Sequence, residues 1–429
     1  MSNQNSTATK RLLLPIILTV FIDLLGATIV IPILAPLFLD LQHGIMPIEF
    51  STITNKAVQL PAIMRDRTIL FGFLIAAFPL AQFFGAPLLG SWADRAGRKK
   101  VLTISLIGTF IGYVLFAIGV HYKLLWLLFF SRILDGFTGG NISIAYSAIS
   151  DLSTPDTKTR NFGLVGMAFG LGFIIGPFLG GKLSDPSMVH WFNFETPFWF
   201  SAILCLINII LVIWLFHETL AQKSNKPASL FQGFDNIIKA YARPQLRTMF
   251  LIVFLLSFGF NIFTQFLQVY LIQKFSFNQS QIGDYFAYIG LWIAFTQGFL
   301  TRKLSKKWAP ANLVSVFTFT LSIALAMLLL PNQVYLLFML SPLVAMSQGI
   351  MSPNLQTLVS NSGSADEQGE ILGINQSVQS LAQAIPPIVA GYMVSINIHL
   401  PILLSSLFTL MAWMVFMFVY KRKFITSLH

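Results

Sequence analysis

The sequence contains few charged residues. Only 10% of its 429 residues are Asp, Glu, Lys or Arg and 55% are hydrophobic, whereas a soluble domain carries about 25% charged residues. A soluble globular core is therefore excluded. A transmembrane helix needs about 20 mostly apolar residues, and runs of that length occupy most of the chain. The sequence predicts an all-α membrane protein with about twelve transmembrane helices.

Cysteine is scarcer still. Cys205 is the one cysteine of the chain and lies in an apolar run, so neither an internal disulfide nor a cysteine metal site can form. The six histidines are scattered along the sequence, and they make no recognisable metal or nucleophile cluster. We therefore expect no metal site, no cofactor and no enzymatic activity.

Acidic residues are fewer than basic ones, and the net charge of +11 raises the question of a nucleic-acid partner. Most of the 27 Lys and Arg fall in connections on one side of the predicted spans, as the positive-inside rule describes. The basic residues therefore orient the chain, with both termini cytoplasmic, and require no nucleic acid. The first apolar run follows Lys10 and Arg11 as in a signal peptide. It is too long for one and contains Asp23, which favours a first transmembrane helix.

The predicted spans form two halves. A polar connection at 217–246 separates an N-terminal six-helix bundle at 1–216 from a C-terminal one at 247–429. A second long connection, at 39–66, is predicted to be a surface loop. The spans are expected at 12–38, 67–92, 101–120, 124–150, 160–181, 196–216, 247–273, 281–304, 309–330, 333–359, 369–395 and 399–420.

A weak internal repeat supports two pseudo-symmetric halves. A basic segment recurs at an offset of 208 residues, where Gly90, Arg95, Arg98 and Lys99 match Gly298, Lys303, Lys306 and Lys307. The fifth span recurs at an offset of 210, where Gly172, Gly176, Pro177, Gly180 and Gly181 match Ala382, Pro386, Pro387, Ala390 and Gly391. Such parallel repeats occur in transporters whose halves move about a site near the middle of the membrane.

The connection between spans 2 and 3 carries a dense motif of small and charged residues. Its candidate gating residues are Gly90, Asp94, Arg95, Gly97, Arg98 and Lys99. Small residues allow backbones to approach, Asp94 can neutralise a positive helix end, and the arginines can pair with acids at other helix ends. A basic loop that only sets the topology is the alternative.

Span 5 carries a second motif, with small residues four positions apart. Its residues are Gly172, Gly176, Pro177, Gly180 and Gly181. Small residues at this spacing allow a close helix contact, and Pro177 permits bending because it disturbs the backbone hydrogen bonds. Helix packing alone would explain this pattern.

These motifs resemble those of the major facilitator superfamily, and within it the twelve-helix drug/proton antiporters of the tetracycline-exporter type. The resemblance identifies the motif between spans 2 and 3 as a latch between the halves when the protein is open to the outside, and the span 5 motif as antiporter-associated. Further similar segments are Asp23-x-x-Gly26 with Pro32 and Pro36, Arg132-Ile-Leu-Asp135-Gly136, and His217-Glu218-Thr219-Leu220, in which His replaces the family's Pro.

The sequence also departs from the family pattern. Arg302 stands at the second-half counterpart of Asp94, and Asp135 occupies a position that often holds Gln in the family. Tetracycline exporters also carry acids in spans 3 and 9, whereas 101–120 and 309–330 contain none. A tetracycline–metal complex is therefore not the expected substrate.

Asp23, Arg132, Asp135 and Asp284 are ionisable residues within predicted spans, where charge is costly and usually functional. Arg132 and Asp135 are three residues apart and can neutralise each other on one helix face, either as a structural pair or as part of proton coupling. Asp23 has no basic residue in its span and is the stronger proton-coupling candidate; a hydrogen-bonded structural acid is the alternative. Asp284 lies near the outer end of its span, and we expect it to be solvated.

By resemblance, spans 1, 4, 7 and 10 line the substrate cavity, with a contribution from span 11. The candidates are Asn141, Tyr146, Asn261, Gln265, Gln268, Gln348, Asn354, Asn375 and Gln379. A polar, uncharged face among apolar side chains suits amphipathic organic molecules. Hydrogen bonding between helices is the alternative role for each amide.

The sequence therefore predicts a secondary transporter that exports a small amphipathic organic compound in exchange for protons. We expect a monomer in the inner membrane of a bacterium, with its substrate, protons and the lipid bilayer as partners. Uptake of a small solute, by proton symport or facilitated, is one alternative. A receptor or scaffold that has a transporter fold but does not transport is another.

Overall fold

Regular structure in the described part of the chain is entirely helical. The computed structural model describes residues 2–47, 56–153, 155–220, 232–242, 244–362 and 368–425. Within these ranges there is no strand, and the prediction of an all-α membrane protein is confirmed. The helices that precede the long polar connection are α1 (Ser2–Ile29), α2 (Ile31–Leu39), α3 (Lys56–Ala96), α4 (Arg98–His121), α5 (Leu125–Thr138), α6 (Asn141–Asp151), α7 (Pro155–Leu183) and α8 (Thr196–Leu215).

The second set of helices begins inside that connection. It comprises α9 (Gln232–Ala242), α10 (Pro244–Phe275), α11 (Gln279–Phe295), α12 (Arg302–Leu304), α13 (Pro310–Met327), α14 (Val334–Ser360), α15 (Gln368–Ala384), α16 (Pro386–Ile396) and α17 (Leu400–Val415), with π-helical segments η2 (Thr296–Thr301) and η4 (Phe416–Ile425). Each predicted span coincides with one helix or with consecutive helical segments. The helix α9 was not predicted.

Eight helical stretches among the described residues are long and apolar enough to cross a membrane. They are Leu13–Leu39, Ala62–Ala96, Arg98–His121, Thr196–Leu215, Leu246–Phe275, Pro310–Met327, Val334–Ser360 and Leu400–Arg422, and a shorter apolar helix covers Gly170–Leu183. The predicted surface loop at 39–66 is wrong in its second part, because α3 begins at Lys56. Good helix formers such as Leu60 and Met64 extend the helix beyond the apolar run. Residues 40–47 form turns, and 48–55 lie outside the described residues.

Proline or glycine interrupts three of the predicted spans. Pro32 stands in the first turn of α2, Pro386 begins α16, and Gly139 and Gly140 separate α5 from α6. Proline removes a backbone donor, and such breaks are tolerated in membranes where neighbouring groups satisfy the freed backbone. The break after α5 places Asn141 at the start of a new helix.

The chain divides into two compact units. Unit 1 comprises Met1–Pro47, Leu80–Gln232 and Gln279–Ala287, and unit 2 comprises Ile48–Pro79, Gly233–Asn278 and Tyr288–His429. The first part of α3 therefore belongs to unit 2, and the first part of α11 to unit 1. The division of the sequence into bundles at 1–216 and 247–429 remains a prediction.

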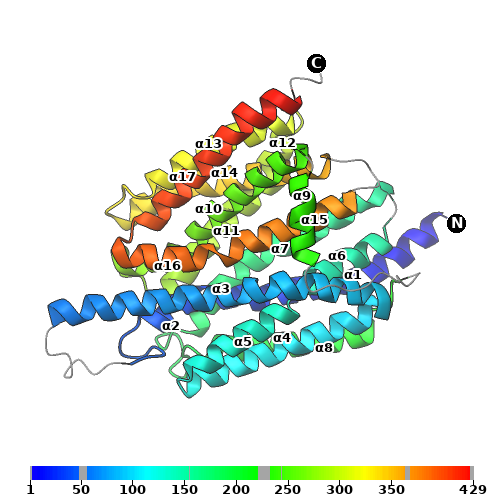
Figure 1. The fold of residues 1–429 in the computed structure, drawn as a ribbon. Coiled ribbons are helices and arrows are strands. Elements are labelled where there is room, and N and C mark those ends of the chain that lie inside the picture. The colour runs from blue at the N-terminus through cyan, green and yellow to red at the C-terminus, as the bar shows by residue number, and fades with distance from the viewer. Residues whose placement is uncertain are drawn as a thin grey trace. The chain divides into compact units, whose positions relative to one another are not determined.

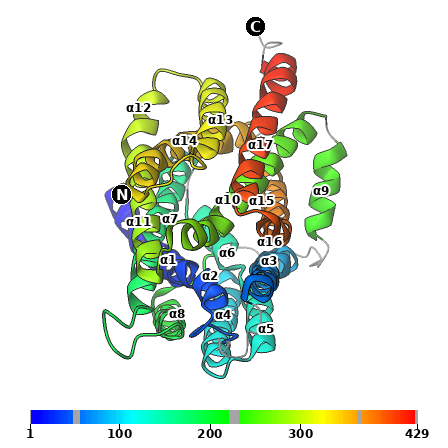
Figure 2. The ribbon, with the colours of Figure 1, turned by 90° about the vertical axis from the view of Figure 1, so that its left-hand side faces the viewer.

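Within unit 1, α1 packs against α7 and α8, and α4 packs against α5 and α8. Figure 1 shows α4, α5 and α8 side by side. Phe116 of α4 and Phe198 of α8 stack in this core, with ring centroids 4.1 Å apart. Within unit 2, α17 packs against α10 and α13, and α13 against α14, as Figure 2 shows from another side. Each unit thus buries apolar side chains between packed helices.

Candidate functional site

Asp23 lies in a polar cluster formed by three helices of unit 1. Its Oδ1 accepts a hydrogen bond of 2.9 Å from Nδ2 of Asn141, the first residue of α6. Ser105 of α4 donates to the other side of that amide, at Oδ1 of Asn141. The amide is 5% exposed, so the cluster connects α1, α6 and α4 through a buried side chain. The structure thus joins the proton-coupling candidate Asp23 to Asn141, which the sequence assigned to the cavity.

Arg132 and Asp135 form the ion pair that their spacing predicts. Arg132 Nη2 lies 3.2 Å from Asp135 Oδ2, and both side chains are buried. The guanidinium carbon lies 5.0 Å from the centroid of the Phe116 ring, and a Cβ added at Gly112 would lie 2.9 Å from Asp135 Cβ. The pair is therefore packed tightly against α4, and the charge of Asp135 has a fixed partner.

Span 3 supplies polar residues that are not among the predicted site residues. Ser105 contacts Asn141, and the hydroxyl of Tyr113 lies 3.6 Å from the Cβ that a side chain at Gly26 would carry. Ser105, Thr109 and Tyr113 recur every four residues and share one helix face. That spacing could have indicated a polar face on α4 directed at the intramembrane acids.

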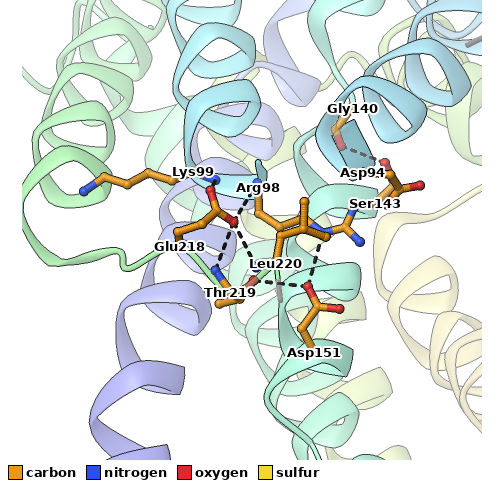
Figure 3. A network of polar contacts seen from close by, with 9 residues as sticks. All are labelled: Asp94, Arg98, Lys99, Gly140, Ser143, Asp151, Glu218, Thr219 and Leu220. Atoms are coloured by element: carbon orange, nitrogen blue, oxygen red, sulfur yellow. Dashed lines mark hydrogen bonds and ion pairs between the residues drawn. The ribbon is translucent and has the colours of Figure 1, made fainter. Parts of the chain in front are cut away.

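The motif between spans 2 and 3 joins the ends of four helices in unit 1 (Figure 3). Arg98 pairs with Asp94 on α3 and, through Nε, with Oδ2 of Asp151 at the end of α6, 3.2 Å away. Asp151 also accepts a hydrogen bond from Oγ1 of Thr219 at 3.2 Å. Lys99 Nζ donates to the carbonyl of Ile213 in the last turn of α8 at 2.8 Å, where the helix dipole favours a cation.

Glu218 caps the start of α4 from a distant part of the sequence. Its carboxylate accepts hydrogen bonds from the backbone N–H of Arg98 at 2.9 Å and of Lys99 at 3.2 Å. Gly97 precedes them with φ +106°, and a Cβ there would overlap the carboxylate. Only glycine combines this backbone conformation with that close approach. Asp151 and Glu218 are thus the acids paired with the motif, and neither was predicted as a site residue.

The other residues of this motif are Arg95, Asp94 and Gly90. Arg95 lies in the last turn of α3, and Asp94 is half-exposed beside Arg98. A side chain at Gly90 would meet no described atom within 4 Å, so this glycine makes no close helix contact here.

We expect Glu218→Gln to change how stability depends on pH. Burial raises the pKa of Glu218, but hydrogen bonds from four backbone N–H groups outweigh it, so the pKa lies below its ordinary value. A carboxylate with a lowered pKa stabilises the fold above its unfolded-state pKa, and this contribution is lost as pH falls through the folded-state pKa. The melting temperature should therefore fall more between pH 5 and pH 3 in the wild type than in Glu218→Gln.

At pH 7 the variant should be less stable, by about 1 kcal/mol for a weakened helix cap. Asp66→Asn is the matched control, because Asp66 is an exposed acid whose partner is its neighbour Arg65. Parallel pH profiles of wild type and Glu218→Gln would contradict the cap.

The span 5 glycines pack α7 directly against α1. An added Cβ at Gly172 would lie 3.1 Å from Leu24 Cβ, at Gly176 it would overlap the Thr28 side chain, and at Gly180 the Ile29 carbonyl. Thr28 Oγ1 also donates to the Gly172 carbonyl at 2.8 Å. The motif therefore fixes the helix that carries Asp23.

The last glycine of the motif, Gly181, faces a different helix. An added Cβ at Gly181 would lie 3.1 Å from Gly283 Cα, and one at Gly283 would lie 2.5 Å from the Pro177 carbonyl oxygen. In unit 2, a Cβ at Gly72 would similarly lie 3.3 Å from Gly391 Cα. Gly181 and Gly391 correspond in the internal repeat, so the repeat extends to a pair of glycine contacts.

Asp284 borders the contact between α7 and α11. Its Oδ2 lies 2.9 Å from Lys182 Nζ, which also donates to Ser280 Oγ at 2.7 Å. The Asp284 side chain is 44% exposed, so it is half-solvated, as expected near a helix end, but it is also ion-paired.

The remaining cavity candidates are distributed over both units. Tyr146 lies on α6 in unit 1 and is 36% exposed. Two amides of unit 2 donate within their own helices: Asn261 to the Ser257 carbonyl at 2.7 Å and Asn354 to the Ile350 carbonyl at 2.7 Å. The other members are Gln265 and the buried Gln268 on α10, Gln348 on α14, and Asn375 and Gln379 on α15, where Asn375 donates to Gln356 at 3.2 Å.

No group of three His, Cys, Asp or Glu side chains in the described ranges is arranged to hold a metal ion. The candidate polar groups are thus one acid bonded to an amide and one buried ion pair in unit 1, and a set of uncharged amides in unit 2. This chemistry can bind a proton and hydrogen-bond an organic molecule.

Comparison with known proteins identifies the family. The model of the Major Facilitator Superfamily matches residues 16–387. Major facilitator superfamily domain-containing protein 10 of Mus musculus is 29% identical over 418 residues, covering 89% of this chain and 87% of that protein. Tetracycline resistance protein, class H, of Pasteurella multocida is 30% identical over 364 residues, covering 82% of this chain and 85% of that protein.

A solved structure shares the fold. The crystal structure of the human organic anion transporter MFSD10 (TETRAN) superposes with a TM-score of 0.70 at 24% identity, covering 95% of this chain and 99% of that chain. The resemblance to drug exporters of the tetracycline type is thereby confirmed at the level of the family. The chain is an integral multi-pass membrane transporter, not an enzyme, and belongs to the Major Facilitator Superfamily.

Proposed function

We propose that this transporter exports a small amphipathic organic compound in exchange for protons. The observation that carries the proposal is the contrast between the two acids of unit 1. Asp135 is paired with Arg132 at 3.2 Å, whereas the described partner of Asp23 is the neutral amide of Asn141. Because a proton on Asp23 need not displace a cation, Asp23 can be charged or neutral at modest cost, as a coupling site requires.

Protonation of Asp23 would change the contact that it makes with Asn141. The carboxylate accepts from the amide nitrogen, whereas a neutral carboxylic acid carries its own O–H donor. Asn141 is also bonded to Ser105, so a change at Asp23 is transmitted to α4 and α6. Tyr146 follows Asn141 by little more than one turn on α6 and is a partly exposed aromatic side chain on the helix that begins with Asn141.

The relatives support an amphipathic organic substrate. They include Multidrug resistance protein 2 of Bacillus subtilis, 25% identical over 96% of both chains, and the tetracycline resistance proteins. The solved human relative is described as an organic anion transporter, which makes an anion the second substrate class to examine. The amides of unit 2, on α10, α14 and α15, are the proposed substrate contacts.

Alternating access about these contacts is part of the proposal. The bundles at 1–216 and 247–429, connected by 217–246, are the moving parts, and the protein acts as a monomer with both termini in the cytoplasm of a bacterial cell. The network around Arg98 is the proposed latch, and the glycines of α7 are the proposed antiporter motif.

The purified full chain in proteoliposomes tests this function. We expect a fluorescent amphipathic cation or a fluorescent organic anion to accumulate when the lumen is acidic relative to the medium. Addition of the transported probe should also release protons from the lumen, detected with an internal pH dye. Substrate flux that does not depend on the pH difference would contradict proton antiport. Accumulation driven by an inward proton gradient would indicate symport, and binding without flux would indicate a receptor.

A further inference from the structure

A cavity of about 340 Å³ opens at the basic end of unit 2, where α13 begins and η4 follows α17. Two cations line it, Lys307 and Lys421, together with Trp308, Asn312 and Ser315. Its described lining contains no acid. Lys421 Nζ is held in place by a 2.9 Å hydrogen bond to Asn312 Oδ1, and Ser315 Oγ bonds to Met417 Sδ at 2.8 Å, which joins the two walls.

The internal repeat shows what this cavity lacks. At an offset of 208, Lys307 corresponds to Lys99, so the segment that leads into α13 at Pro310 corresponds to the start of α4. In unit 1 the connection after α8 returns the carboxylate of Glu218 to cap α4. In unit 2 the segment after α17 places Lys421, a cation, beside the start of α13. The first turn of α13 contains no acid, and its N-cap Ala309 has no side-chain cap.

A helix start without an acid, flanked by two lysines, favours an anion from outside the chain. Backbone N–H groups and the helix dipole favour negative charge at that end, and lysine ammonium groups bind phosphate. We propose that this cavity binds the phosphate group of an anionic phospholipid, which supplies negative charge at the start of α13 as Glu218 does at the start of α4.

The location selects a lipid over a free anion. The cavity lies at the ends of two membrane-crossing stretches, Pro310–Met327 and Leu400–Arg422, at the level where headgroups lie. Trp308 is 46% exposed, and tryptophan is enriched at the membrane interface. Basic pockets between transmembrane helices on the cytoplasmic side are typical sites for anionic headgroups.

Apolar side chains continue from the cavity along α13. Val316 lines the cavity and is 43% exposed, and Phe319 and Ile323 follow at 39% and 45% exposed. Their spacing of three and four residues puts them on one helix face. Phe319 also packs on Trp413 of α17, with ring centroids 4.8 Å apart. An acyl chain would thus find an apolar face below the phosphate site.

Titration of the detergent-purified full chain with dioleoylphosphatidylglycerol, followed by native mass spectrometry, tests the site. Lys307→Ala/Lys421→Ala should weaken binding about 25-fold, or about fivefold for each lysine. Lys303→Ala/Lys306→Ala removes the same charge from nearby exposed residues outside the cavity lining, and should change binding less than about twofold.

A second variant keeps the test decisive if the double variant folds poorly. Asn312→Asp supplies the missing carboxylate at the start of α13 beside Lys421, so it should keep or raise the melting temperature and abolish phosphatidylglycerol binding. Equal loss in the Lys303/Lys306 variant, or equal binding of dioleoylphosphatidylcholine, would overturn the site. Displacement of the lipid by millimolar inorganic phosphate would identify a free-anion site and overturn the lipid assignment. Substrate flux plays no part in these readouts, so their outcome is independent of the proposed transport function.

Discussion

Asp23→Asn should eliminate accumulation driven by a pH difference. With one proton exchanged for each substrate molecule, a difference of one pH unit supports a substrate gradient of about tenfold, or about 1.4 kcal/mol. The variant cannot bind that proton, so its accumulation ratio should fall to about one. Proton release from the lumen on addition of substrate should disappear as well.

The fold should tolerate this change. An asparagine carbonyl at position 23 can still accept the hydrogen bond that Asn141 Nδ2 now donates to Oδ1. Exchange of labelled for unlabelled substrate, which needs no net proton movement, should therefore continue in the variant. Asp66→Asn serves as the control, because it removes an exposed acid paired with Arg65 and should leave accumulation at its full value. Tenfold accumulation by Asp23→Asn would place proton coupling elsewhere in the chain.

The spans were predictable because a membrane-crossing helix requires a long run of apolar residues, which is visible in the sequence. Long apolar runs fix them, and each predicted span coincides with helical structure. The start of α3 was not predictable by this criterion, since residues 56–66 are helical without being continuously apolar. The helix α9 was not predicted for a similar reason, because it is short and lies in a polar connection. Its contacts with other helices include a hydrogen bond of 3.1 Å from Asn236 Nδ2 to Ser377 Oγ.

Pairings over long sequence distances were the least predictable part of the site. Spacing predicted the Arg132–Asp135 contact, because three residues on a helix share a face. Nothing local indicates that Glu218 meets the N–H groups of Arg98 and Lys99, 120 and 119 residues away. The same holds for Asn141 and Asp23, which are 118 residues apart. Such contacts depend on how the helices pack against one another, and this packing cannot be inferred from a single sequence.

Gly180→Ala should destabilise the protein, although it adds a single methyl group. The new Cβ would overlap the carbonyl oxygen of Ile29 on α1, a backbone atom that cannot rotate away. Overpacking of this kind costs about 1–3 kcal/mol or more. Because α1 carries Asp23, the displaced helix should also lower transport.

Gly170→Ala is the matched control, since it lies on the same helix and its added methyl group would meet no described atom within 4 Å. There the substitution should be neutral or stabilising by up to about 1 kcal/mol, because alanine is the better helix former. Melting curves of both purified variants, recorded by circular dichroism in the same detergent, provide the comparison. Equal melting temperatures would show that α7 does not need backbone contact with α1, and the motif's glycines would then require another explanation than packing.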